Sequence, residues 1–221
     1  MLVLAVDTSS AAVTAGVLRL PPVGSPEVLA EQVTVDARAH GELLMPSVCS
    51  VLASAEVSMG ELAAVVCGAG PGPFTGLRVG MVTAAALGDA LRIPVYPVGS
   101  LDAIAYRAGA GSPLVVVSDA RRREVYWARY DCSGIRVDGP HVGRPSDLPL
   151  TSVSRVAGVA DALVAPVGVA VVPPRYPDPA GLLAVVAAAV RACALPGPFT
   201  PLYLRRPDAL EPGPRKRVMP V

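Results

Sequence analysis

Lysine and histidine are nearly absent from this chain of 221 residues. Among its 19 Lys and Arg residues only Lys216 is a lysine, and the two histidines are His40 and His141. The scarcity of lysine leaves little basis for Schiff-base chemistry or for a Walker-type phosphate loop. Neither histidine has a partner ligand at helical spacing, so the sequence predicts no bound transition metal.

Cysteine pairs, excess charge of one sign and long apolar runs are also missing. The cysteines, which are widely spaced and form no Cys-x-x-Cys pair, are Cys49, Cys67, Cys132 and Cys193. They favour free thiols in a reducing compartment over a disulfide framework or a zinc site. The net charge of +1 does not fit a protein that binds nucleic acid strongly by itself. No basic leader is visible and no apolar run reaches the length of about 20 residues that spans a bilayer, so we expect a cytoplasmic protein without a membrane partner.

Proline and glycine are abundant instead, with 24 and 21 residues, which predicts short elements separated by turns. Apolar periodicity predicts strands at 2–6, 13–17, 28–35, 62–67 and 95–98, and helices at 43–55, 77–91 and 101–107. Ser100 is the expected N-cap of the third helix. The order β-β-β-α-β-α-β-α indicates a mixed sheet flanked by helices.

The second half of the sequence begins like the first. Leu114–Asp119 and Leu2–Asp7 are both apolar runs that end in aspartate, and each precedes a polar turn and another strand. This repeat predicts a duplicated α/β fold, with half-domains at 1–110 and 111–206. A helix is expected at 181–194 and a fraying basic tail at 207–221, whereas proline and glycine obscure the pattern between 144 and 179.

Polar segments at strand ends form a candidate nucleotide or anion site. The turn after the first strand offers a carboxylate and hydroxyls that can receive magnesium-bound phosphates, although such turns are more commonly structural Asx turns. The segment 70–80 joins a strand to a helix, where backbone N–H groups can hold an anion. Its structural alternative is a rigid connection with Thr75 as N-cap. The candidate site comprises Asp7, Thr8, Ser9, Gly70, Gly72, Thr75, Gly76 and Asp119, with a weakly bound nucleotide and magnesium as the cofactor considered.

Two other polar features have a functional and a structural interpretation. His40 is a lone histidine at a helix start, which is more often a capping or surface residue than a metal ligand. Arg121, Arg122 and Arg123 follow Asp119 and offer guanidinium groups to phosphate or RNA. A run of arginines in a turn is, however, more often simply solvated.

The helices at 43–55 and 77–91 carry more apolar residues than one buried face needs. This surplus predicts that another chain covers part of their surface. The expected interface residues are Leu44, Val48, Val51, Met81, Ala84, Ala85 and Gly88.

The string Gly-Pro-Gly-Pro-Phe-Thr-Gly-Leu-Arg-Val-Gly at 70–80 resembles the signature of the TsaB (YeaZ) family, whose usual form is GPGSFTGLRIG. Weaker matches follow in the family's order at 4–9, 38–44, 100–105, 119–127 and 201–205. Two departures are Pro73, where the family has serine, and 158–161, where the family's Gly-Asp-Gly-like turn is missing.

This resemblance implies an actin-like (ribonuclease H-like) fold of two duplicated halves. It also implies a part in forming threonylcarbamoyladenosine next to the anticodon of tRNA. Members of that family are non-catalytic partners of TsaD, which is the transferase and has a His-x-x-x-His metal site. The ATPase TsaE joins the complex. The first two helices are then expected to contact TsaD or, alone, a second copy in a homodimer, and tRNA is expected to bind only through the complex. The alternatives are an actin-like ATP-dependent kinase and a metallopeptidase, although His40 has no second histidine with which to form a metal site.

Overall fold

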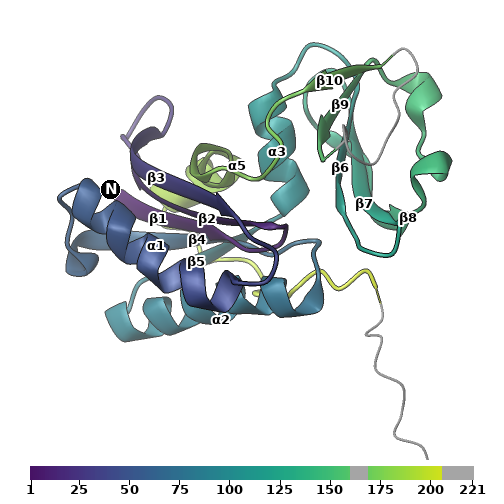
Figure 1. The fold of residues 1–221 in the computed structure, drawn as a ribbon. Helices are drawn as coiled ribbons and strands as arrows, with labels where there is room; N and C mark the ends of the chain where they lie inside the picture. Colours follow the sequence, from purple (N-terminus) through teal and green to yellow (C-terminus); the bar gives the residue numbers. More distant parts are fainter. Residues whose placement is uncertain (160–168, 206–221) are drawn as a thin grey trace, which may run out of the picture.

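The structure, a computed structural model, describes residues 1–159 and 169–205, and two separate five-stranded sheets form its framework (Figure 1). The first sheet consists of β1 (Leu2–Asp7), β2 (Ala12–Arg19), β3 (Glu27–Val35), β4 (Leu62–Gly68) and β5 (Val95–Val98), in the order β3-β2-β1-β4-β5. The second consists of β6 (Leu114–Asp119), β7 (Val125–Tyr130), β8 (Arg136–Gly143), β9 (Arg155–Gly158) and β10 (Ala170–Val172), in the order β10-β9-β6-β7-β8. The helices are α1 (His40–Ser54), α2 (Phe74–Leu91), α3 (Ser100–Ala108) and α5 (Pro179–Arg191), with 3-10 turns at Met59–Glu61, Pro145–Asp147 and Leu150–Ser152.

The two sheets have the same topology. In the first, β1 lies at the centre, antiparallel to β2 and parallel to β4. In the second, β6 takes that place, antiparallel to β7 and parallel to β9. The duplicated α/β fold predicted from the repeated apolar run is therefore confirmed, with β1 and β6 as equivalent central strands.

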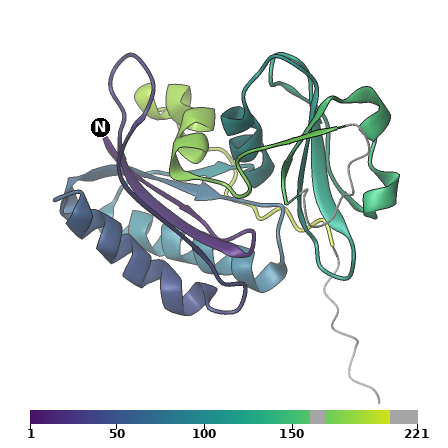
Figure 2. The same ribbon diagram turned by 45° about the horizontal axis from the view of Figure 1, so that its top comes forward.

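Strand alternation distributes side chains to the two faces of each sheet. In β1, Leu4 and Val6 pack toward α1 and α2, whereas Val3 and Ala5 pack toward α5 on the opposite face. Both faces of the first sheet are thus buried, which explains why β1 is apolar at every position before Asp7. Figure 2 shows α1 and α2 below this sheet and α5 above it.

The helices do not follow the expected boundary at residue 110. Leu101 and Ile104 of α3, a helix that precedes the boundary, pack against the second sheet. Leu182 and Leu183 of α5, which comes from the second half of the sequence, are fully buried against the first sheet. The Arg107 Nε–Asp178 Oδ2 ion pair of 2.7 Å also links the two helix regions. Each half of the chain therefore supplies a helix that completes the core of the other.

Several expected element boundaries need correction. Helix α2 begins at Phe74 with Pro73 as its N-cap residue, so Thr75 lies inside the helix and does not cap it. Ser100 is likewise the first residue of α3, whose N-cap is Gly99. Helix α5 starts earlier than expected, because the Asp178 side chain accepts a hydrogen bond from the Gly181 backbone. The expected tail at 207–221 lies outside the described residues.

Truncation of Leu182 tests whether α5, from the second half of the sequence, completes the core of the first half. We expect Leu182→Ala to lower the free energy of unfolding by about 2–5 kcal/mol, because it leaves a cavity between α5 and the first sheet. Val185→Ala, on the same helix but 39% exposed, should change it by about 0.5 kcal/mol or less. Urea unfolding of both variants measures the difference, and equal losses would show that α5 does not pack on this sheet.

Candidate functional site

The turn between β1 and β2 is bound tightly to the start of α2. The Thr8 hydroxyl donates a hydrogen bond to the Gly76 carbonyl at 2.7 Å and accepts one from the Gly80 backbone N–H at 2.8 Å. One buried side chain therefore joins two segments that are about seventy positions apart in sequence.

Glycines in the β4–α2 loop and in the first turn of α2 allow this close approach. A Cβ atom at Gly72 would lie 2.2 Å from the Ser9 carbonyl oxygen, and one at Gly76 would lie 2.7 Å from the Thr8 carbonyl oxygen. Both distances are shorter than any tolerated carbon–oxygen contact, so only glycine fits. The chain itself fills the space between turn and loop in which a phosphate was expected.

Asp7 lies at the centre of this packing with no exposed surface. Its Oδ1 accepts hydrogen bonds from the backbone N–H and the hydroxyl of Ser9, each at 2.8 Å, and its Oδ2 accepts one from the Ser100 hydroxyl at 2.6 Å. Burial raises the pKa of Asp7 above its ordinary value of 3.8, and the hydrogen bonds from Ser100 and Ser9 and the charge of His40 partly offset this.

These contacts do not fit a magnesium–nucleotide site at Asp7. Magnesium requires near-octahedral oxygen ligands and usually keeps several water molecules. Both oxygens of this carboxylate already bind side chains of the protein, and Gly68 leaves no gap, because a Cβ there would lie 1.7 Å from Oδ2. Asp7 therefore connects β1 to the start of α3.

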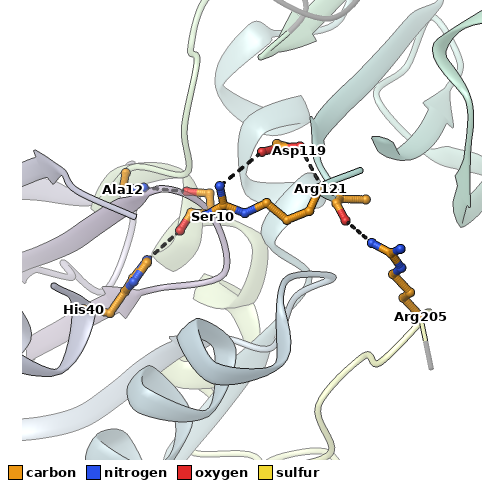
Figure 3. Close-up of polar contacts among 7 residues, drawn as sticks. Ser10, Ala12, His40, Asp119, Arg121 and Arg205 are labelled. Carbon is orange, nitrogen blue, oxygen red and sulfur yellow. Dashed lines mark hydrogen bonds and ion pairs between the residues drawn. The ribbon is translucent and has the colours of Figure 1, made fainter. Parts of the chain in front are cut away.

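A cavity of about 300 Å³ lies beside this packed region, between the two halves. The starts of α1 and α2 border it, and its polar lining includes Ser10, Arg38, His40, Thr75 and Arg121. Figure 3 shows the Arg121 side chain extending from the second half toward Ser10. The cavity places two guanidinium groups and the first turns of two helices together, which is an arrangement that favours a negative ligand.

His40 and Arg121 are oriented by neighbouring groups. His40 is 8% exposed, and its Nε2 lies 2.7 Å from the Ser10 carbonyl oxygen (Figure 3). Because a carbonyl can only accept, Nε2 carries the proton. The Arg121 guanidinium lies 3.8 Å from Asp119, which also accepts a hydrogen bond from the Arg121 backbone N–H at 2.8 Å. The expectation that His40 is a surface or capping residue is thus wrong, because the histidine is buried and holds the neighbouring turn.

The structure divides the expected site residues into two groups. Thr75 and Gly76 line the cavity. The others from the first half are buried within the turn-and-loop packing, namely Asp7, Thr8, Ser9, Gly70 and Gly72. Asp119 pairs with Arg121 from the second half. Sequence reasoning missed Arg38 and His40 as lining residues, although both fall in the matched segment 38–44. Nucleotide binding stays a prediction.

The expected interface residues are mostly core residues. Six of them are buried within the chain, namely Leu44, Val48, Val51, Met81, Ala84 and Gly88. Ala85 alone in that set is exposed. The six fix α1 and α2 to the first sheet, so other side chains form the outer surface of these helices.

Within residues 1–159 and 169–205, no group of three or more His, Cys, Asp or Glu side chains is arranged to hold a metal ion. The helices in these ranges are also too short or too polar to cross a membrane. His141, the second histidine, pairs with Asp138 at 2.7 Å on the exposed face of β8. The expectation of no bound metal stays a prediction.

Comparisons with known proteins link the chain to tRNA modification. The family model described as "TsaD: tRNA N6-adenosine threonylcarbamoyltransferase" matches residues 27–144. An uncharacterized protein of Mycobacterium tuberculosis is 54% identical over 209 residues, which cover 94% of this chain and 93% of that protein. The tRNA threonylcarbamoyladenosine biosynthesis protein TsaB of Bacillus subtilis is 34% identical over 131 residues, or 59% of this chain and 55% of that protein.

A solved structure has the same fold. YeaZ from Pseudomonas aeruginosa is 27% identical, with a TM-score of 0.73, and the match covers 92% of this chain and 99% of that one. A second structure from that organism, titled an uncharacterized protein with similarity to peptidase YEAZ, is 28% identical with a TM-score of 0.71. The match over nearly the full chain includes both halves of the duplicated fold.

Replacement of Gly72 tests the packing of the loop against the turn. We expect Gly72→Ala to destabilise the protein by about 1–3 kcal/mol or more, because the added methyl group would collide with the Ser9 backbone. Gly60→Ala is the matched control, since a Cβ at Gly60 meets nothing within 4 Å. Thermal unfolding compares the two, and an unchanged Gly72→Ala protein would contradict the packing described.

The buried carboxyl group of Asp7 should affect stability through pH. Because its pKa is raised on folding, the folded protein binds this proton more tightly than the unfolded chain does. Its contribution therefore favours folding at acid pH and is lost as the pH rises from 3.8 through the raised pKa. The free energy of unfolding of the wild type should fall relative to that of Asp7→Asn over this window in urea titrations. Parallel curves for the two proteins would contradict this interpretation.

Proposed function

Because the chain belongs to the TsaB (YeaZ) family, we propose that it is a non-catalytic partner subunit of a TsaD-type threonylcarbamoyltransferase. In this role it is required for threonylcarbamoyladenosine formation next to the anticodon of tRNA, in the cytoplasm. The partner contacts the outer surface of α1 and α2, and the isolated chain uses the same surface to form a homodimer. A TsaE-like ATPase joins the complex, and tRNA associates through the complex.

The composition of the outer surface of α1 and α2 is the observation that carries this proposal. Most exposed residues of α1 and α2 are small or uncharged, among them Gly41, Pro46, Cys49, Ser50 and Ala53 of α1 with Val82, Ala85 and Ala86 of α2, and the charged exceptions are Glu42, Arg78 and Asp89. Val82 is 65% exposed. Small side chains let helices of another chain approach closely, and they lose little conformational entropy when covered.

The surroundings of Asp7 support a role without phosphoryl transfer at this position. An actin-like kinase needs a carboxylate that faces the phosphates of a nucleotide and its magnesium ion. Asp7 is the strand-end carboxylate of the first half, and its oxygens bind Ser9 and Ser100 instead. The kinase alternative is therefore the weaker candidate. An anion in the cavity near His40 and Arg121 would bind without a metal ion held by Asp7.

A charge on the outer surface of α2 tests the contact with the partner. We expect Ala85→Glu to weaken association with the TsaD-type protein of the same cell by about a hundredfold or more, because burial of an unpaired carboxylate costs several kcal/mol. Formation of threonylcarbamoyladenosine in a reconstituted reaction should fall with it. Size-exclusion chromatography and circular dichroism measure assembly and folding.

Ala188→Glu is the control, since it introduces the same charge at an exposed alanine of α5. This variant should assemble and support the modification like the wild type. A folded Ala85→Glu protein that still binds its partner and supports the modification would show that α2 is not the contact. A wild-type chain that neither binds the TsaD-type protein nor stimulates the reaction would contradict the proposed function itself.

A further inference from the structure

A second hollow, of about 730 Å³, lies on the second half of the molecule and is lined mainly by arginines. We call it the arginine hollow and define it by Arg122, Arg123, Arg144 and Arg205, with Glu124 as the one acidic residue among the described residues that line it. The formal charge of this lining is +3, although the whole chain carries only +1. Positive charge is therefore concentrated locally rather than spread over the surface.

Three segments that are far apart in sequence bring these arginines together. Arg122 and Arg123 come from the β6–β7 turn, Arg144 follows β8, and Arg205 belongs to the C-terminal segment. Arg205 is held in place because it donates a hydrogen bond to the Ala120 carbonyl at 3.0 Å (Figure 3) and lies 3.6 Å from Glu124.

Glu124, the acidic group among the described residues of the lining, is therefore engaged with Arg205. Within the part of the chain that the structure describes, neither Arg123 nor Arg144 forms an ion pair. Their guanidinium groups keep their capacity for charge-assisted hydrogen bonds to a ligand.

The turn that carries the arginines has an unusual backbone. Arg121, Arg122 and Arg123 have φ values of 65°, 53° and 62°, a left-handed conformation that costs L-residues about 1–2 kcal/mol each. This conformation directs neighbouring arginines to different places, since Arg121 lines the cavity between the halves and the other two line the arginine hollow. The turn therefore presents its positive charges on two sides.

Comparison of the two halves shows that the fold does not require this charge. The equivalent turn of the first half contains Thr8, Ser9 and Ser10, which are buried and uncharged. In the second half the same position in the topology is exposed and carries three arginines. Since the fold is maintained with either turn, the arginines meet a requirement other than folding.

The chemistry of the hollow fits phosphates rather than a protein surface. Guanidinium groups bind phosphate oxygens in a planar, bidentate manner, and several of them over one hollow suit a chain of successive phosphates. Protein interfaces need an apolar or aromatic core, whereas Pro145 is the only apolar residue among those of this lining that the structure describes. Interfaces with nucleic acid are polar and strongly positive.

We infer that the arginine hollow contacts the phosphodiester backbone of tRNA while the tRNA is held by the assembled complex. This inference rests on the proposed function, which supplies the tRNA. The local charge contributes to binding, and the small net charge of the chain keeps its own affinity for RNA low.

The test uses the full chain with Arg123→Gln and Arg144→Gln combined. Its affinity for unmodified tRNA is measured over a range of salt concentrations, both alone and in complex with the TsaD-type protein. Each lost phosphate contact should lower the slope of log K against log salt by about 0.7–0.9. We therefore expect the slope to fall by about 1.5 and the affinity to fall about tenfold or more at low salt.

The matched control combines Arg19→Gln and Arg136→Gln. It removes the same charge at exposed arginines outside the hollow, where ion pairs with Glu27 and Asp102 add little stability. This control should keep the affinity and salt slope of the wild type. Equal behaviour of the two double variants, or a weaker affinity without a change in slope, would overturn the inference.

Two other outcomes are distinguished by the same samples. If the hollow variant loses its association with the TsaD-type protein, the hollow binds an acidic protein surface and the inference is wrong. If the wild-type chain does not join that protein, the proposed function fails, and the salt slopes of the full chains alone on tRNA decide whether the hollow contacts phosphates. A slope that falls only in the hollow variant supports this contact in that case as well.

Discussion

The close approach of two backbones, at the β1–β2 turn and the β4–α2 loop, is the constraint on which the rest of the first half depends. Thr8 bridges to Gly76 and Gly80, and Asp7 reaches Ser100 at the start of α3. These contacts set where α2 and α3 begin relative to β1. The cavity between the halves lies beside this packing. Ser10 and His40, which are joined by a hydrogen bond, form part of its wall.

Duplication places the same topological element in two environments. Asp7 and Asp119 both end a central strand, yet Asp7 is fully buried and Asp119 pairs with Arg121 at the surface. A buried carboxylate is stable only where hydrogen bonds compensate for lost hydration, and Ser9 and Ser100 supply them in the first half. Asp119 instead keeps 37% of its side chain exposed, and the turn that follows it carries charge.

Local patterns of the sequence predict the five strands of the first sheet, the first two strands of the second sheet and the duplication, because alternation and a repeated apolar run that ends in aspartate are local signals. Helix starts were missed both where the cap has no side-chain hydrogen bond, as at Pro73, and where it has one, as at Asp178. The strands β9 and β10, with four and three residues, are too short to show a period. The burial of Asp7 and His40 depends on partners far away in sequence, such as Ser100 and Ser10, so composition at a strand end predicts a polar site but not its accessibility.

The interface residues expected from the sequence illustrate the same limit. Large apolar side chains at helical spacing, such as Leu44 and Met81, are the ones that a helix buries against its own sheet. What is left for a partner is the complementary set of small residues, including Ala85 and Ala86, whose low hydrophobicity gives a weak sequence signal. Under the proposed function, contact with the partner depends on shape and close packing at the first half, while positive charge is concentrated on the second half at the arginine hollow. The two copies of one fold thus carry surfaces suited to different kinds of partner, since packing selects a protein and concentrated positive charge selects a polyanion.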